Sequence, residues 1–232
     1  MPHRPKLVLL HGALGAQSQF KEIEELLKEN FNIFTLDFEG HGSAFLKAGN
    51  SFSIENFAEN LKVFLDNNSL LKADIFGYSM GGYVALHLTA ISPDSIGRIF
   101  TLGTKFDWTP ESSQKETKML DRAKMLEKVP QFVDVLKTRH FASGWESVVD
   151  NTKAMMLSLG ENPVLKSDVL KGIPHRVRIG VGDRDTMVNF EESRDVFKTL
   201  PNAEFEVLPN TPHPFEKVSA EQLVASIKNF FV

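Results

Sequence analysis

The chain has 232 residues, of which 42% are hydrophobic and 24% are charged, an ordinary composition for a globular protein with a sizeable core. A formal net charge of -4 provides no basic surface, so nucleic acid and anionic membranes are not expected as partners. The absence of cysteine excludes disulfides, thiolate catalysis and cysteine-ligated metals.

The N-terminal segment holds only a short apolar run, LVLL at 7–10, before polar residues return. That run is shorter than the apolar part of a signal peptide, and no stretch of the chain approaches the ~18 apolar residues of a membrane span. We therefore expect a cytoplasmic protein with no membrane partner. The sequence leaves the oligomeric state open.

The first half of the chain alternates short apolar runs with amphipathic segments. Strands are predicted at 7–10, 32–37, 73–77 and 98–104. Helices are predicted at 20–30, 53–68 and 80–92. Ser53 is the expected N-cap of the second helix, and Pro93 is expected to end the third. The apolar faces of the first two helices are expected to consist of Ile23, Leu26 and Leu27, and of Ile54, Phe57, Leu61 and Phe64.

The pattern changes near residue 105. Residues 105–168 carry lysines, glutamates and four methionines, and they are typical of helices with no strand between them. The alternation then returns, with strands predicted at 177–182 and 204–208 and helices at 191–200 and 219–231. Strands that alternate with helices predict a parallel sheet covered on both faces. We therefore expect an α/β core made of residues 1–104 and 169–232, with 105–168 inserted as a helical cap over the carboxyl ends of the strands.

Residues 77–82 read GYSMGG and lie where a predicted strand ends and a predicted helix begins. G-x-S-x-G alone is weak, because it arises by chance in roughly one chain in a dozen of this length. The strand–turn–helix context is that of a nucleophile elbow, in which a strained turn exposes the serine, here Ser79. Side chains at 77 and 81 would crowd the neighbouring strands, and the helix N-terminus favours developing negative charge. The competing interpretation is a Ser-Gly turn without chemistry.

A serine nucleophile needs a base to accept its proton and an acid to orient the base. His213 lies in LPNTPHPFEK, a proline-rich loop directly after a predicted strand, at the same edge of the sheet as Ser79. The segment VGDRDTMV follows another predicted strand and offers Asp183 and Asp185 as the acid, and position alone does not choose between them.

The other six histidines have weaker claims to the role of the base. His87 lies inside a predicted helix and is expected to be a packed or surface residue. His11 and His41 lie in glycine-flanked turns, where a structural hydrogen bond is the simpler interpretation. The remaining three have no supporting context: His3, His140 and His175.

Acyl transfer also needs backbone N–H groups aimed at the oxygen of the tetrahedral intermediate, each worth about 3–4 kcal/mol. One is expected from Met80, which follows the nucleophile. The other is expected from Ala13 in HGALG (11–15), a turn of small residues directly after the first predicted strand. A phosphate-binding loop is the competing interpretation, but HGALG lacks both G-x-G-x-x-G and the Lys-Ser/Thr of a nucleotide loop.

Four separated elements together resemble the α/β-hydrolase superfamily: HGALG, DFEGHGSA, GYSMGG, and GDRDTMV with TPHPFE. The resemblance spans nearly the whole chain outside 105–168. It implies that HGALG forms the oxyanion turn and that DFEGHGSA is a structural loop, although Glu39 and Ala44 depart from the usual pattern. It also selects Asp185, the last residue of GDRD, as the acid and His213 as the base. The sheet should then have six parallel strands in the order 4-3-5-6-7-8 of the family's strand names, without the family's two leading antiparallel strands.

Residues and resemblance together predict a serine hydrolase that acts on a carboxylic ester or thioester through an acyl-enzyme. Ser79 would attack the acyl carbon, His213 would transfer the proton, and Asp185 would orient His213. A small-molecule acyl substrate is the expected partner, and no cofactor or metal is implied. Four side chains of the inserted segment would form either an apolar acyl pocket or a core of the cap itself: Trp108, Met119, Met125 and Trp145.

The same apparatus supports other chemistry, because a fold does not fix a function. Haloalkane dehalogenases and epoxide hydrolases of the superfamily use an aspartate nucleophile, and Ser79 argues against both. The menaquinone-pathway synthase shares HG-x-x-G and G-Y-S-x-G-G with this chain but carries an arginine where this chain has Tyr83. Its anionic substrate would lack a partner here, which argues against that function. Hydrolases of carbon–carbon bonds in β-diketone products, perhydrolase side activities and a non-catalytic ligand-binding member of the fold stay open as alternatives.

Overall fold

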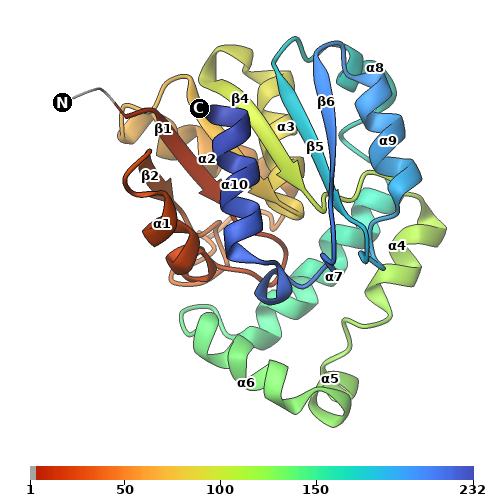
Figure 1. Ribbon diagram of the computed structural model, residues 1–232. Helices are drawn as coiled ribbons and strands as arrows, with labels where there is room; N and C mark the ends of the chain where they lie inside the picture. Colours follow the sequence, from red (N-terminus) through yellow and green to blue (C-terminus); the bar gives the residue numbers. More distant parts are fainter. Residues whose placement is uncertain (1–3) are drawn as a thin grey trace.

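Six strands form one parallel sheet in the computed structural model, which describes residues 4–232 (Figure 1). The sheet order is β2-β1-β3-β4-β5-β6, and each neighbouring pair is parallel. This is the order implied by the resemblance, so the predicted six-stranded α/β fold is confirmed. The strands are β1 (Lys6–Leu10), β2 (Asn32–Thr35), β3 (Ala73–Tyr78), β4 (Ile96–Leu102), β5 (Val177–Gly182) and β6 (Ala203–Leu208).

Helices cover both faces of the sheet because successive strand residues point to opposite sides. In β1, Leu7 and Leu9 pack on one face with helices α1 and α10, whereas Val8 and Leu10 pack on the other with α2 and α3. Figure 1 shows α1 and α10 in front of the sheet and α2, α3 and α9 behind it. The core helices are α1 (Lys21–Leu27), α2 (Ile54–Asn67), α3 (Met80–Ile91), α8 (Ser167–Lys171), α9 (Phe190–Thr199) and α10 (Ala220–Phe231), with 3₁₀ turns at η1 (Gln17–Phe20), η2 (Pro93–Ser95) and η3 (Phe215–Lys217).

The first predicted helix, 20–30, is longer than α1, and the prediction that Leu26 belongs to its buried face was wrong. Ile23 and Leu27 are buried, but 40% of the Leu26 surface is exposed. The two buried residues stand four apart and form one narrow stripe, while Leu26 lies about 100° around the helix from Leu27. The N-terminus of α2 is as expected, since the side chain of Ser53 accepts a hydrogen bond from the Asn56 N–H.

Residues 105–168 contain four complete helices, the first two residues of α8 and, as the structure describes this whole segment, no strand. The complete helices are α4 (Pro110–Thr117), α5 (Arg122–Lys128), α6 (Pro130–Arg139) and α7 (Trp145–Glu161). Figure 1 shows them beyond the carboxyl ends of the strands, with α5 and α6 farthest from the sheet. Met125 and Trp145 are buried in a small cluster of this segment, so these two side chains form its own core.

The inserted segment is anchored where it leaves β4. The backbone N–H groups of Phe106 and Asp107 both donate to Oε2 of Glu192, at 3.0 and 2.8 Å. The other carboxylate oxygen of Glu192 accepts from the N–H of Asn189 at 2.9 Å, within the capping box of α9. The first residues of the insertion are therefore fixed to the N-terminal turn of α9. None of the helices in residues 4–232 has the length and apolar character needed to cross a membrane.

Candidate active site

Ser79 occupies a sharp turn between β3 and α3. Its backbone has φ 50° and ψ -117°, a conformation that costs a non-glycine residue about 1–3 kcal/mol. A Cβ at Gly81 would lie 2.4 Å from the carbonyl oxygen of Leu10, as expected for a position that faces a neighbouring strand. A Cβ at Gly77 would instead lie 2.5 Å from Cα of Gly82, so this glycine allows α3, rather than a strand, to pack closely.

Three side chains distant in the sequence meet at the carboxyl edge of the sheet. The hydroxyl oxygen of Ser79 lies 3.4 Å from Nε2 of His213, and Nδ1 of His213 lies 2.7 Å from Oδ2 of Asp185. The second carboxylate oxygen of Asp185 accepts the N–H groups of Met187 and Val188 at 2.9 and 2.8 Å. This carboxylate therefore favours a proton on Nδ1 of the imidazole, which leaves Nε2 as an acceptor facing the serine hydroxyl.

Asp183, the other acid left open by position alone, has different partners. Its Oδ1 accepts the N–H of Thr211 at 3.0 Å, two residues before His213. Hydrogen bonds from the backbone of Asn210 and Thr211 lower the pKa of the Asp183 carboxyl. Asp183 thus shapes the loop that carries His213, whereas Asp185 contacts the imidazole itself.

Tyr78 contacts the candidate site and was not assigned to it from the sequence. Its hydroxyl donates a hydrogen bond to the backbone carbonyl of His213, and its ring packs against Phe215 with centroids 4.9 Å apart. Burial, with a further contribution from the charge of Asp185, raises the pKa of the Tyr78 hydroxyl, so it stays a donor at neutral pH. The only signal available in the sequence was its position beside Ser79.

Ala13 and Met80, the two expected oxyanion donors, line the same small cavity beside Ser79. Ala13 belongs to a tight turn closed by a hydrogen bond from the Gly15 N–H to the Gly12 carbonyl at 3.0 Å. Leu14, the next residue of this turn, has a φ of 57°. A Cβ at Gly12 would lie 3.0 Å from Cβ of Ser79, so the turn and the elbow are in close contact.

The end of α6 holds this turn from the inserted segment. Nη1 of Arg139 and Nε2 of His140 both donate to the carbonyl of Leu14, at 2.9 and 3.0 Å. The Gly42 N–H donates to Nδ1 of His140 at 3.0 Å, which leaves Nε2 as the donor. Arg139 also donates through Nη2 to Glu216 at 2.7 Å, three residues beyond His213. His140, which had no context in the sequence, is thus a buried link between the turn and the inserted segment.

His140 belongs to a group of three buried histidines. The ring centroids of His11 and His41 are 5.0 Å apart, and those of His41 and His140 are 5.8 Å apart. Burial lowers the pKa of both His11 and His140 to about 4, so both rings are neutral at pH 7. The N–H of Phe38 donates to Nε2 of His11 at 3.2 Å, in agreement with the expected structural role of that ring.

The loop DFEGHGSA is organised around Asp37. Its carboxylate accepts the backbone N–H groups of Gln17 and Ser43 at 2.8 and 2.9 Å. Burial alone would raise the pKa of Asp37, but these hydrogen bonds bring it below its usual value. Glu39, which departs from the expected pattern, accepts from Asn50 and Asn56 at 2.8 and 3.1 Å.

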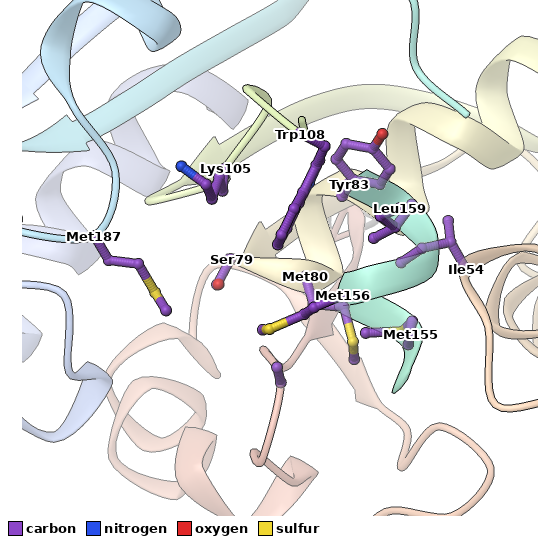
Figure 2. Close-up of a pocket in the computed structure, with 11 residues that line it drawn as sticks. Ile54, Ser79, Met80, Tyr83, Lys105, Trp108, Met155, Met156, Leu159 and Met187 are labelled. Atoms are coloured by element: carbon purple, nitrogen blue, oxygen red, sulfur yellow. The ribbon is translucent and has the colours of Figure 1, made fainter. Parts of the chain in front are cut away.

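Two cavities meet at Ser79. The smaller has a volume of about 30 Å³ and is lined by Ala13, Ile54, Ser79, Met80, Tyr83, Lys105, Trp108, Met155, Met156, Leu159 and Met187. Figure 2 shows Trp108 directly beside Ser79, with Tyr83, Leu159 and Ile54 behind it and Met187 on the opposite side. The larger has a volume of about 530 Å³ and is lined by His213, Tyr78, Pro214 and Phe215 from the core and by Met119, Leu120, Phe132 and Val135 from the insertion, among others.

The remaining histidines lie outside this arrangement. His87 is buried in α3, which is the packed alternative of the two expected, and Nε2 of His175 bonds the Pro93 carbonyl at 2.9 Å. His3 lies outside the described residues. Within residues 4–232, no group of three or more acidic, histidine or cysteine side chains is arranged to hold a metal ion.

A family model and solved structures agree with the fold described above. A family model described as alpha/beta hydrolase fold matches residues 5–195. The chain superimposes with a TM-score of 0.78 on 2-hydroxy-6-oxo-6-phenylhexa-2,4-dienoate hydrolase from Rhodococcus sp. strain RHA1, at 22% identity over 100% of this chain and 92% of that one. A thermophilic esterase from Thermogutta terrifontis superimposes with a TM-score of 0.76, at 20% identity over 97% and 89% of the two chains.

Sequence comparison adds relatives at low identity. The pimeloyl-[acyl-carrier protein] methyl ester esterase of Aeromonas salmonicida is 28% identical over 100 residues, which are 43% of this chain and 38% of that protein. The match to three other curated relatives extends over 33%, 60% and 63% of their lengths.

Proposed function

Since the chain belongs to the alpha/beta hydrolase family, we propose that it is a serine hydrolase that cleaves a carboxylic ester or thioester through an acyl-enzyme. The observation that carries this proposal is the hydrogen-bonded series Ser79–His213–Asp185 at the elbow. In this proposal residues 1–104 and 169–232 form the hydrolase core, and residues 105–168 act as a cap over the site.

The first half of the reaction forms the acyl-enzyme. Oγ of Ser79 attacks the acyl carbon while Nε2 of His213 accepts the hydroxyl proton, and Asp185 stabilises the resulting imidazolium. The N–H groups of Ala13 and Met80 donate to the oxyanion. When the intermediate collapses, the bond from the acyl carbon to the leaving oxygen or sulfur breaks, and His213 transfers its proton to that atom.

The second half releases the acid. A water molecule gives a proton to Nε2 of His213 and attacks the acyl carbon of the Ser79 ester. The bond between Oγ and the acyl carbon then breaks, and His213 returns the proton to Oγ. The elbow supports this cycle because its strained turn holds Oγ away from the sheet, at the mouth of both cavities.

Covalent labelling with a fluorophosphonate probe tests the proposal. The wild type should label at Ser79, as read by peptide mass spectrometry, and Ser79→Ala should abolish both labelling and turnover of ester substrates. The control is Ser158→Ala, because Ser158 is an exposed residue of α7 and its loss should leave labelling intact. A folded wild type that does not label would overturn the proposal. Labelling without turnover of any ester or thioester would overturn the ester assignment and favour carbon–carbon bond hydrolysis.

A further inference from the structure

The two cavities at Ser79 are lined by different parts of the proposed machinery. Met80, an expected oxyanion donor, lines only the smaller cavity, and Ala13 lines both. His213 lines only the larger one, together with Tyr78 and Phe215. Met80 and His213 therefore face different spaces, and Ala13, like Ser79, lies where the two spaces meet.

This division orients a substrate. The leaving oxygen must come within hydrogen-bond reach of Nε2 of His213 in order to receive its proton, so the leaving group extends into the larger cavity. The carbonyl oxygen must point at the N–H groups of Ala13 and Met80. With these two substituents of the acyl carbon assigned, the acyl chain is directed into the smaller cavity.

The smaller cavity is too small for a long chain. A single water molecule requires ~10–15 Å³ in this measure, so about 30 Å³ accommodates two or three non-hydrogen atoms. Large side chains line it. Trp108 lies beside Ser79, and Tyr83 and Leu159 lie farther from Ser79 (Figure 2). Tyr83 is 2% exposed, and its hydroxyl accepts the N–H of Leu165 at 3.2 Å, which fixes the ring.

The larger cavity suits a bulky apolar group. Five apolar side chains of this cavity come from the inserted segment, and three of them are exposed to solvent: Met119, Phe132 and Val135. The charged side chain of Arg139 at this cavity is already paired with Glu216. A long alkyl or aromatic leaving group can therefore lie along the cavity and reach solvent.

From this geometry, and resting on the proposed function, we propose that the substrates are esters of short acyl groups, of about two to four carbons, with a bulky apolar alcohol. Apolar side chains around the acyl carbon and the leaving group carry the selectivity, and the cap and the core both provide them.

A pair of isomeric esters tests the orientation on the wild-type protein. Octyl acetate and ethyl octanoate contain the same atoms and differ only in which side of the ester carries the long chain. The proposal requires kcat/KM for octyl acetate to exceed that for ethyl octanoate, on the order of a hundredfold. Equal rates, or a preference for ethyl octanoate, would overturn it.

Matched variants locate the selectivity. Leu159→Ala enlarges the smaller cavity without altering the triad or the oxyanion donors, and it should reduce the ratio between the two esters about tenfold. Leu120→Ala, in the wall of the larger cavity, should not reduce it. Active sites are counted by the fluorophosphonate label in each preparation. An unlabelled wild type would refute the proposed function, whereas a labelled enzyme with no preference would refute only the acyl assignment.

Discussion

Asp183 and Asp185 stand two residues apart, yet each contacts a different part of the site. Asp185 accepts the Nδ1–H of His213, and Asp183 accepts the N–H of Thr211 in the loop that carries that histidine. One carboxylate therefore acts on the tautomer and charge of the base, and the other acts on the path of the backbone. Replacing each aspartate with asparagine should therefore lower kcat to different extents.

Asp185→Asn should lower kcat on the order of a thousandfold, because an amide cannot stabilise the imidazolium and can favour the wrong tautomer. Asp183→Asn retains an oxygen that accepts from Thr211 and should lower kcat by about tenfold at most. The measurement is kcat and KM on one acetate ester, normalised to labelled sites. If Asp183→Asn is the more damaging variant, the acid has been assigned to the wrong residue.

Among individual residues of the candidate site, those that lie in short sequence motifs could be predicted, and those that reach the site only through contacts in the fold could not. Ser79, His213 and the pair of candidate acids follow from short patterns after predicted strands, and the family resemblance then selected Asp185. Tyr78 and His140 could not be found in that way. Their partners, the carbonyls of His213 and Leu14, are 135 and 126 residues away along the chain.

The end of α6 acts on the turn that contains Ala13. Arg139 and His140 are consecutive, and both donate to the carbonyl of Leu14, which follows Ala13 directly. Leu14 is held at a positive φ, where a leucine has few stable conformations. A helix of the inserted segment therefore fixes the turn expected to bind the oxyanion.

His140→Ala should lower kcat about tenfold with little change in KM, because a looser turn weakens a contact formed in the transition state. The loss is partial because Arg139 keeps its hydrogen bond to the same carbonyl. His140→Gln supplies one acceptor and one donor and should restore much of kcat. The control is His175→Ala, because His175 is a half-buried histidine outside the site whose Nε2 bonds the Pro93 carbonyl of η2. Loss of stability with unchanged kcat per labelled site would show that His140 only supports the fold.

Strand positions were predictable to within one or two residues, because each strand is a short run rich in apolar residues. The four inner strands are largely buried, whereas the edge strands β2 and β6 are only partly buried. Helix α1 was less predictable. Its packing against β1 and α10 buries Ile23 and Leu27 and leaves Leu26 exposed. The individual helices of 105–168 were not assigned from the sequence, since a segment that packs partly on itself shows no single apolar face.

For the whole molecule, the three buried histidines make stability depend on pH. Burial lowers the pKa of His11 and His140 to about 4, from about 6.5 in an unfolded chain. Hydrogen bonds to the carbonyls of Gly12 and Leu14 and the charge of Asp37 favour the protonated rings, but burial outweighs them, and the charge of Arg139 acts in the same direction as burial. Between these two pKa values the unfolded chain binds more protons than the folded one, so the free energy of unfolding falls as the pH decreases.

Urea unfolding at a series of pH values from about 7.5 to 4 should show this loss, on the order of 3 kcal/mol for each of the two histidines once the pH reaches 4. His140→Gln removes one of the titrating rings and should give a flatter dependence on pH over the same range. The control is His175→Gln, which should retain the wild-type slope. A wild-type stability that does not change between pH 6.5 and 4 would contradict the neutral, buried state of these rings.

Several contacts hold the inserted segment to the rest of the protein, and two of them bound its outer helices: Glu192 holds its first residues, and Leu14 and Gly42 hold the end of α6. Neither contact can be displaced without disturbing α9 or the turn that contains Ala13. Exposed side chains of the span between them, residues 118–138, line the larger cavity, so we expect reactants and products to enter and leave beside this span. A covalent cross-link between this span and the sheet should therefore obstruct the entrance of the larger cavity without moving Ser79, Asp185 or His213.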